Sequence, residues 1–264
     1  MKIAVSGAAG AMGRRIIALL GESKDCQLIA ALERPAHPDL GKDAGAVAGV
    51  GPLGVRISSE LAGRPDVLVD FSTPEATTAL ARECARRGIA VVVGTTGLSA
   101  EQLAVLREEV ASKVPVLVAP NMALGVNLLF RLVEEVAGAL GAGYDVEIVE
   151  AHHRRKKDAP SGTALELARR ACKALGLQPE AALRHGRQGL AGPRGNSEIG
   201  IHAVRGGDIV GEHTVVFAGE GERVELTHRV SNRDVLARGA LRAAAFLARR
   251  PAGLYSMQDV LFRA

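Results

Sequence analysis

The hydrophobic and polar positions in the first half of the chain alternate between short apolar runs and longer segments with helical spacing. The apolar runs show little in–out alternation, which is typical of parallel strands covered on both faces. The segments 74–88 and 99–113 have the spacing of helices, and Ser99 with Gln102 predicts a capping box at the start of the second one. This succession predicts an α/β fold with a Rossmann-type, doubly wound parallel sheet. The predicted strands begin at Lys2, Cys26, Asp66, Ile89 and Pro115.

The pattern changes in the second half of the chain. Residues 122–141 form a long apolar segment that predicts a helix suited to packing between domains. Several runs within 144–231 alternate more clearly between apolar and polar residues, which predicts a sheet with one exposed or partner-covered face. Residues 234–262 return to helical spacing, and we expect them to rejoin the first domain. The arginine- and glycine-rich span 178–197 is expected to be a mobile loop.

These patterns predict two domains. Residues 1–122, completed by 237–264, are expected to form a dinucleotide-binding domain. Residues 123–236 are expected to form a smaller α+β domain with a mixed, largely antiparallel sheet.

Glycines mark the turn between the first predicted strand and helix. Gly7, Gly10 and Gly13 give the spacing GxxGxxG, which departs from GxGxxG because Ala9 stands at the middle position. In a dinucleotide site such glycines allow a tight turn, a close approach to pyrophosphate, and close packing of the helix on the strand. The helix amides would then face the phosphates. A purely structural turn remains the alternative.

The ends of the later predicted strands carry further candidate cofactor ligands. Glu33 lies about 20 residues after Gly13, where an acidic residue binds a ribose 2′-hydroxyl, and the adjacent Arg34 would suit a 2′-phosphate. Both NADH and NADPH are therefore compatible with the sequence, and a solvated pair at a strand end is the other interpretation. Ligands bind beyond the carboxyl ends of strands in such sheets, so three strand tips should line the cofactor crevice. These tips are 71–73, 94–96 and 119–121.

The segment EAHHRRKKDAPSGTALELA, residues 150–168, combines two histidines, four cationic residues and a helix start. Ser161 is expected to cap a helix, so that the amides of Gly162 and Thr163 form an anion site. Lys156 adds positive charge, and the histidines can move protons near neutral pH. The segment therefore predicts a proton-donating pocket for a small carboxylate substrate. A solvated charged face is the alternative.

Composition narrows the function further. The chain of 264 residues has 47% hydrophobic and 23% charged residues, which is ordinary for a globular protein. A net charge of +4 and 3% aromatic residues argue against nucleic-acid binding. No apolar run is long enough to cross a membrane, and the early glycines argue against a signal peptide, so a cytoplasmic protein is expected. The scattered thiols of Cys26, Cys84 and Cys172 predict reduced core cysteines.

A metal site is not expected, because the adjacent pair His152 and His153 would point apart in a continuing strand. The remaining histidines of the second half show no recognisable partners, and we expect structural roles for them. They are His185, His202, His213 and His228.

Motifs along nearly the whole chain resemble the dihydrodipicolinate reductase family of the bacterial and plant lysine pathway. The most specific is EAHHRRKKDAPSGTA, and VRGGDIVGEHTVVFAGEGERVELTHRVSNRDVLARGA is the longest. Shorter matching motifs are VSGAAGAMGR, DFSTPE, VVVGTTG and APNMALGVN. Met122 departs from the family pattern, in which an aromatic residue is frequent, and Arg155 and Lys157 make the loop more basic than in many members.

The resemblance implies an NAD(P)H-dependent oxidoreductase that reduces 4-hydroxy-tetrahydrodipicolinate, a small dicarboxylate, in lysine and diaminopimelate biosynthesis. It implies that His152 and Lys156 are catalytic proton donors, and that His153, Gly162 and Thr163 bind the substrate carboxylates. It also implies a homotetramer formed through the second-domain sheets, and a hinge closure between the domains. The implied cofactor-binding residues are Gly7, Ala8, Ala9, Gly10, Ala11, Met12, Glu33, Arg34, Gly94, Thr95, Thr96, Ala119, Pro120, Asn121 and Met122.

Two other functions share parts of this pattern. A different nicotinamide dehydrogenase would share the first domain but would not need the 150–164 motif. A dinucleotide-sensing protein would keep the glycine turn and Glu33 but would not need paired histidines and Lys156 beside an anion site.

Overall fold

The computed structural model describes residues 1–232 and 234–263, and the chain divides into two compact units. Unit 1 comprises Met1–Leu124 and Asp234–Ala264, and unit 2 comprises Gly125–Arg233. The sequence pattern had placed these divisions at residues 122/123 and 236/237. Each unit is described by itself below.

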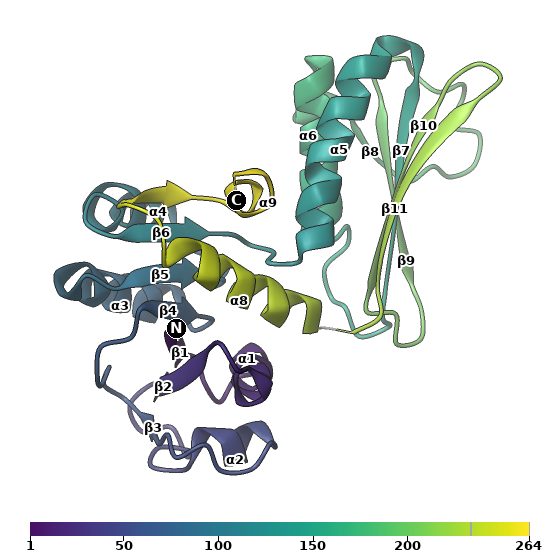
Figure 1. The fold of residues 1–264 in the computed structure, drawn as a ribbon. Helices are drawn as coiled ribbons and strands as arrows, with labels where there is room; N and C mark the ends of the chain where they lie inside the picture. The colour runs from purple at the N-terminus through teal and green to yellow at the C-terminus, as the bar shows by residue number, and fades with distance from the viewer. Residues whose placement is uncertain (233, 264) are drawn as a thin grey trace. The chain divides into compact units, whose positions relative to one another are not determined.

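Unit 1 is built around a parallel sheet of seven strands in the order β12-β6-β5-β4-β1-β2-β3 (Figure 1). The chain runs outward from β1 to β3, then crosses to β4 on the other side of β1. The switch point between β1 and β4 is where open sheets of this kind bind ligands. The strands are β1 Lys2–Ser6, β2 Gln27–Leu32, β3 Ile57–Ser58, β4 Val67–Asp70, β5 Ala90–Val93, β6 Pro115–Val118 and β12 Gly253–Tyr255.

Helices cover both faces of this sheet, so the predicted doubly wound Rossmann-type fold is confirmed. Ile3 and Val5 of β1 lie in a core shared with α1 and α8, whereas Ala4 lies in a second core shared with α3 and η1. Successive side chains of a strand point to opposite faces, so one apolar run serves both cores. The helices are α1 Ala11–Glu22, α2 Ala44–Ala48, α3 Pro74–Arg87, α4 Ala100–Ala104, the π-helical η1 Val105–Val110, α8 Asp234–Leu247 and α9 Met257–Phe262.

Most helix boundaries follow local signals in the sequence. The predicted capping box is present: Gln102 N donates to Ser99 Oγ, and Ser99 N donates to Gln102 Oε1. Thr73 caps α3, and Gly88 ends it in the left-handed conformation. The short elements β3, α2 and β12 were not anticipated, because two to five residues carry too little periodicity to be recognised.

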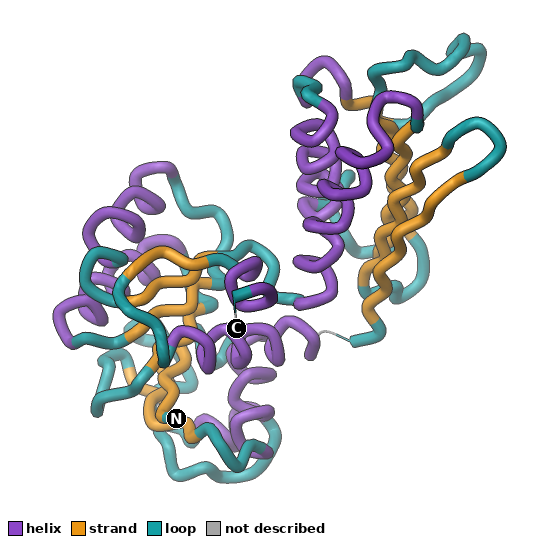
Figure 2. The backbone as a smooth tube through the Cα atoms, turned by 45° about the horizontal axis from the view of Figure 1, so that its top comes forward, coloured by secondary structure: helices purple, strands orange, loops and turns teal. Residues whose placement is uncertain are grey.

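Unit 2 contains a five-stranded mixed sheet in the order β11-β10-β7-β9-β8, with its strands labelled in Figure 1 and drawn in orange in Figure 2. Helix α6 packs on β7, β9 and β10. The expected long apolar helix is α5, and the expected Ser161-capped helix is α6. The elements are β7 Asp145–His152, β8 Leu183–His185, β9 Ile199–Arg205, β10 Gly211–Ala218, β11 Arg223–Val230, α5 Leu124–Leu140, η2 Gly141–Gly143, α6 Gly162–Leu175 and α7 Pro179–Ala182.

The second sheet is mixed, with more residues in antiparallel than in parallel pairs, as expected. Strand β10 pairs antiparallel with β7 and β11, whereas β9 pairs parallel with β7 and β8. The parallel pair follows from α6, because a crossover helix between two neighbouring strands makes them run in the same direction. Alternation within single strands could not reveal this connection.

The span 178–197 is more structured than the expected loop. It contains α7 and β8, and β8 pairs with β9. Arg187 and Arg194 both donate hydrogen bonds to Glu147 of β7. The prediction of a loop is therefore wrong for residues 179–185, which form α7 and β8, and the two arginines tie the following segment to β7.

The described cysteines are all free thiols, as expected; Cys84 and Cys172 are buried and Cys26 is half-buried. Burial raises the pKa of Cys84 to about 12, so this thiol is unreactive at neutral pH. No helix among residues 1–232 and 234–263 is both long and apolar enough to cross a membrane.

Candidate active site

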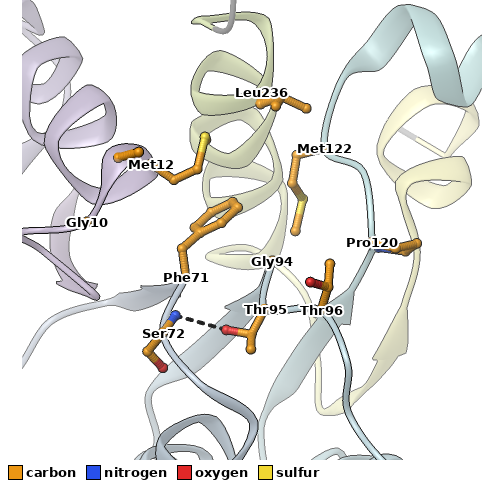
Figure 3. A pocket seen from close by; sticks show the side chains of 11 residues that line it. Gly10, Met12, Phe71, Ser72, Gly94, Thr95, Thr96, Pro120, Met122 and Leu236 are labelled. Carbon is orange, nitrogen blue, oxygen red and sulfur yellow. Dashed lines mark hydrogen bonds between the residues drawn. The ribbon is translucent and has the colours of Figure 1, made fainter. Parts of the chain in front are cut away.

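A cavity of about 400 Å³ opens in unit 1 at the carboxyl ends of the strands (Figure 3). It is bordered by the start of α1, by the tips of β4 and β5, and by the segment after β6. In the close-up, Phe71 points into the cavity with Met12 on one side and Met122 on the other. The lining residues are Gly10, Ala11, Met12, Phe71, Ser72, Gly94, Thr95, Thr96, Pro120, Met122 and Leu236.

The glycine turn below the cavity leaves no room for side chains. Gly7 adopts a φ of 73°, and a Cβ at this position would collide with the carbonyl oxygen of Phe71. A Cβ on Gly13 would collide with the Gly7 carbonyl oxygen. The expected close packing at Gly13 is therefore against the turn itself rather than against the strand.

The N-terminus of α1 is suited to binding an anion. Gly10 occupies the cap position, no side chain caps the helix, and no acidic residue lies in its first turn. Helix amides without an intrahelical acceptor attract phosphate groups. The exposed Gly10 and Ala11 border the cavity, so a pyrophosphate could approach this helix end.

Glu33 lies at the tip of β2 next to the same turn. One of its carboxylate oxygens accepts from Ala9 N at 3.1 Å, and the other accepts from Arg34 N at 3.1 Å. A carboxylate can accept about four hydrogen bonds, so acceptor capacity remains for a ribose hydroxyl. Arg34 is exposed beside it.

Buried Asp70 holds the strand tips in place. Its carboxylate accepts hydrogen bonds from Ser72 Oγ at 2.6 Å, from Thr95 Oγ1 at 2.9 Å, and from Thr77. Ser72 N in turn donates to Thr95 Oγ1 at 3.0 Å (Figure 3). The sequence interpretation named the tips but missed Asp70, which links them.

The structure brings many of the predicted cofactor-binding residues to one cavity, but not all of them. Those that border it are Gly10, Ala11, Met12, Gly94, Thr95, Thr96, Pro120 and Met122. The others are not part of its lining; Gly7, Ala8, Ala9 and Ala119 are buried, while Glu33, Arg34 and Asn121 lie nearer the surface.

A second cluster of polar residues lies at the end of β7 in unit 2. Glu150 is fully buried, and its carboxylate accepts from Arg205 at 2.7 Å and from Ser161 N at 3.0 Å. His152 Nδ1 lies 2.6 Å from the same carboxylate. Glu150 therefore joins the end of β7, the end of β9 and the start of α6.

His213 completes this cluster, although we expected it to be only structural. It is 4% exposed, and its Nε2 lies 3.0 Å from Ser161 Oγ. Its ring packs edge-on against that of His152, with centroids 5.3 Å apart. His202 also has a partner, because its Nε2 lies 2.7 Å from Glu147.

Burial and neighbouring charges change the pKa values in the cluster. Burial would raise the pKa of Glu150, but hydrogen bonds from Arg205, His152 and Ser161 N together lower it. Burial lowers the pKa of His213 to about 4, and the positive charges of His152 and Lys156 add to this, against the opposing effect of Glu150. Glu150 is therefore ionised and His213 neutral at neutral pH.

The remaining predicted site residues follow β7. Lys156 Nζ lies 2.8 Å from both carboxylate oxygens of Asp158, and its amide donates to the His153 carbonyl. Hydrogen bonds from Lys156 lower the pKa of Asp158. Gly162 and Thr163 occupy the first turn of α6, which Ser161 caps through Ala164 N at 3.2 Å. Gly162 is exposed, and a Cβ there would meet nothing within 4 Å.

Comparison with known families identifies both units. Residues 1–122 match the N-terminal segment of dihydrodipicolinate reductase, and residues 125–261 match its C-terminal segment. The chain belongs to the dihydrodipicolinate reductase family. The predictions of family, fold class and enzyme class are therefore confirmed: the chain is an oxidoreductase with a pyridine-nucleotide-binding N-terminal segment.

Relatives within the dihydrodipicolinate reductase family match over almost their whole length. The 4-hydroxy-tetrahydrodipicolinate reductase of Anaeromyxobacter sp. (strain Fw109-5) is 51% identical over 99% of this chain and 97% of its own. The enzyme of the same name from Syntrophotalea carbinolica is 50% identical over 99% and 98%. The dipicolinate-bound dihydrodipicolinate reductase from Paenisporosarcina sp. TG-14 has a TM-score of 0.77 and 27% identity, with 97% of each chain covered.

Five residues in or beside the cavity and the β7 cluster were not anticipated from the sequence; they are Asp70, Glu150, Arg205, His213 and Leu236. The strand register brings two of them to the β7 cluster, because Arg205 lies opposite His152 and His213 lies opposite Glu150. Within the described residues, no three His, Cys, Asp or Glu side chains are grouped as metal ligands would be.

Proposed function

We propose that the chain catalyses the NAD(P)H-dependent reduction of 4-hydroxy-tetrahydrodipicolinate to tetrahydrodipicolinate in lysine and diaminopimelate biosynthesis. The observation that carries this proposal is the His152–Glu150–Arg205 cluster, with Lys156, beside the first turn of α6. A cofactor-sensing protein would have no use for this cluster. The substrate is a small dicarboxylate.

The cavity in unit 1 fits a nicotinamide dinucleotide. The uncapped start of α1 and the glycine turn suit the pyrophosphate, and Glu33 suits an adenosine ribose. Apolar Met12, Phe71 and Met122 offer a surface for a flat ring. When bound there, the reduced nicotinamide supplies the hydride that is added to the substrate ring.

The residues that contact the substrate in this proposal lie in unit 2. The α6 amides at Gly162 and Thr163, with His153, bind the substrate carboxylates, and Lys156 offsets their negative charge. His152 or Lys156 supplies the proton that the reduced ring must gain. Glu150 and Arg205 keep His152 in place while it does so.

Both NADH and NADPH are expected to act as hydride-donating cofactors. Glu33 suits a free 2′-hydroxyl, and the exposed Arg34 suits a 2′-phosphate. A Kd for one cofactor more than about a hundredfold weaker than for the other, about 2.7 kcal/mol, would contradict dual use. The homotetramer and the cytoplasmic location stay predictions.

The test is NAD(P)H oxidation at 340 nm in a coupled assay that generates the substrate in situ. We expect turnover by the wild type, and a loss of kcat of about 10²- to 10⁴-fold in His152→Gln and Lys156→Ala with unchanged cofactor affinity. His185→Gln is the control, because His185 is exposed on β8. A wild type that binds cofactor but does not turn over this substrate would favour another substrate or a sensing role.

A further inference from the structure

Glu150 is a buried carboxylate to which the proposed reaction assigns no direct contact with substrate. It shares one face of β7 with the buried Val146 and Ile148, so an apolar residue would fit the pattern of this strand. A charge in such a position is costly unless it is fully hydrogen-bonded. The function of Glu150 must therefore lie in the groups that it binds.

The partners of Glu150 keep it ionised. Arg205 Nη1 donates to Oε2 and Nη2 donates to Oε1, both at 2.7 Å, which is the bidentate arrangement of a strong ion pair. Ser161 N donates to Oε1 at 3.0 Å. Arg205 Nη2 also donates to the Asp158 carbonyl at 2.8 Å, so the pair is tied to the loop that carries Lys156.

An ionised carboxylate can only accept hydrogen bonds. The contact of 2.6 Å between Glu150 Oε2 and His152 Nδ1 therefore requires the proton to be on Nδ1. Nε2 is then the nitrogen that exchanges a proton with the substrate. A Cβ on Gly211 would lie 3.0 Å from Nε2, so glycine at this position keeps that nitrogen accessible.

We propose that Glu150, fixed by Arg205, is a positioning residue that holds the ring of His152 in place and in the Nδ1–H tautomer. This inference rests on the proposed function, since it names the residue that prepares the proton donor of that reaction. In the transfer, the Nε2–H bond of protonated His152 breaks and its proton goes to the reduced ring. A neutral imidazole remains, with Nδ1–H still donating to Glu150.

The other titratable groups near His152 are either paired with other residues or neutral, so they do not compete with Glu150 for the His152 ring. Arg205 on β9 is already paired with Glu150, and Lys156 is paired with Asp158 in the following loop. His213 on β10 touches the His152 ring edge-on but is neutral at neutral pH. Glu150 is thus the only negative charge among the described partners that contacts the His152 ring.

The first test compares Glu150→Gln with Glu147→Gln. Glu147 is a matched control, because it lies on the same strand and also contacts one histidine, together with two arginines where Glu150 contacts one. We expect Glu150→Gln to lower kcat about 10- to 100-fold at neutral pH, with the KM for NADH unchanged. Glu147→Gln should keep the wild-type kcat.

An unchanged kcat in folded Glu150→Gln would overturn the proposal. So would an equal loss in both variants, because that would indicate a general effect of removing a carboxylate from β7. Wild-type protein that binds cofactor but has no turnover would count against the proposed function instead.

The second test reads the tautomer in the wild-type protein, so it does not depend on Glu150→Gln folding well. In ¹⁵N-histidine-labelled protein, His152 is assigned from the signal that His152→Gln lacks. The neutral ring should show a protonated Nδ1 and an unprotonated Nε2. A neutral ring with its proton on Nε2 would refute the positioning role whatever the kinetics show.

Discussion

At the scale of single residues, the cluster in unit 2 depends on keeping one histidine neutral beside another that carries protons. His213 is nine-tenths buried and touches the His152 ring, so a proton on both rings at once would place two positive charges together. Burial is the main reason that the pKa of His213 falls to about 4. The neutral ring can then pair with Ser161 without opposing protonation of His152.

The lowered pKa of His213 makes stability depend on pH. The unfolded chain binds this proton near the ordinary pKa of 6.5, whereas the folded chain binds it only near 4. The contribution is therefore complete above about pH 6.5 and is lost as the pH falls toward 4. The slope is at most about 1.4 kcal/mol per pH unit. We expect His213→Gln to lose less unfolding free energy than wild type between pH 7.5 and 5.

Urea unfolding followed by tyrosine fluorescence measures this difference. The chain has two tyrosines and no tryptophan, so in a Tyr255→Phe background Tyr144 reports on unit 2 alone. His185→Gln is the control, since this histidine is exposed. Equal losses for wild type and His213→Gln would contradict the argument.

Residue chemistry within one segment was predictable from the sequence, but pairing across the sheet was not. The role of Ser161 as a helix cap was predictable, because the capping signal lies within a few residues of the chain. Glu150, His213 and Arg205 are joined only by the register of β7 with β10 and β9. No local pattern contains that register. Nothing in the sequence therefore indicated that Arg205 and His213 lie beside His152.

At the scale of elements, helix α1 illustrates how little freedom the cofactor turn has. Its start lies so close to the turn that a Cβ on Gly13 would collide with the backbone of Gly7 and Ala8. Further along the same helix, a Cβ on Gly21 would make ordinary contacts with the side chains of Leu53 at 3.4 Å and Val50 at 3.6 Å. A backbone contact therefore requires glycine at position 13, whereas no such contact requires it at position 21.

We expect Gly13→Ala and Gly21→Ala to have opposite effects. The first forces α1 away from the turn, which should cost about 1–3 kcal/mol and weaken NADH binding about tenfold or more. The second should be neutral or stabilise the helix by up to about 1 kcal/mol, because alanine is the better helix former. Thermal unfolding and NADH titration measure both quantities. Wild-type affinity in Gly13→Ala would show that the turn can relax.

Strands and helices were predictable where their sequence patterns extend over many residues. The valine-rich strands and the capped helices were found because burial on both faces and capping each leave a pattern in the sequence. The parallel pairing of β7 with β9 was not found, since it depends on the crossover through α6 rather than on alternation within either strand.

At the scale of the whole molecule, unit 1 is assembled from both ends of the chain. Helix α8 packs on β4, β5 and β6, and β12 adds to the edge of the sheet at β6. Unit 2 is inserted between these two segments. The first core is therefore incomplete until the last residues are in place. The α8 residues that are fully buried in it are Ala237, Ala240, Ala243, Ala244 and Leu247.

This division predicts that a chain ending at residue 232 loses cofactor binding, although α8 contributes only Leu236 to the cavity. Without α8, one face of β4 and β5 is exposed to water, and the strand tips lose the core that supports them. A chain ending at residue 256 is the control, because it keeps α8 and β12 and loses only α9 with its buried Met257 and Val260. NADH titration and hydrophobic-dye fluorescence should show no binding and increased dye uptake for the first chain, and weakened stability with retained binding for the second. Wild-type affinity in the chain ending at residue 232 would mean that residues 1–124 fold without their C-terminal partner, and that the cavity depends on the glycine turn and strand tips alone.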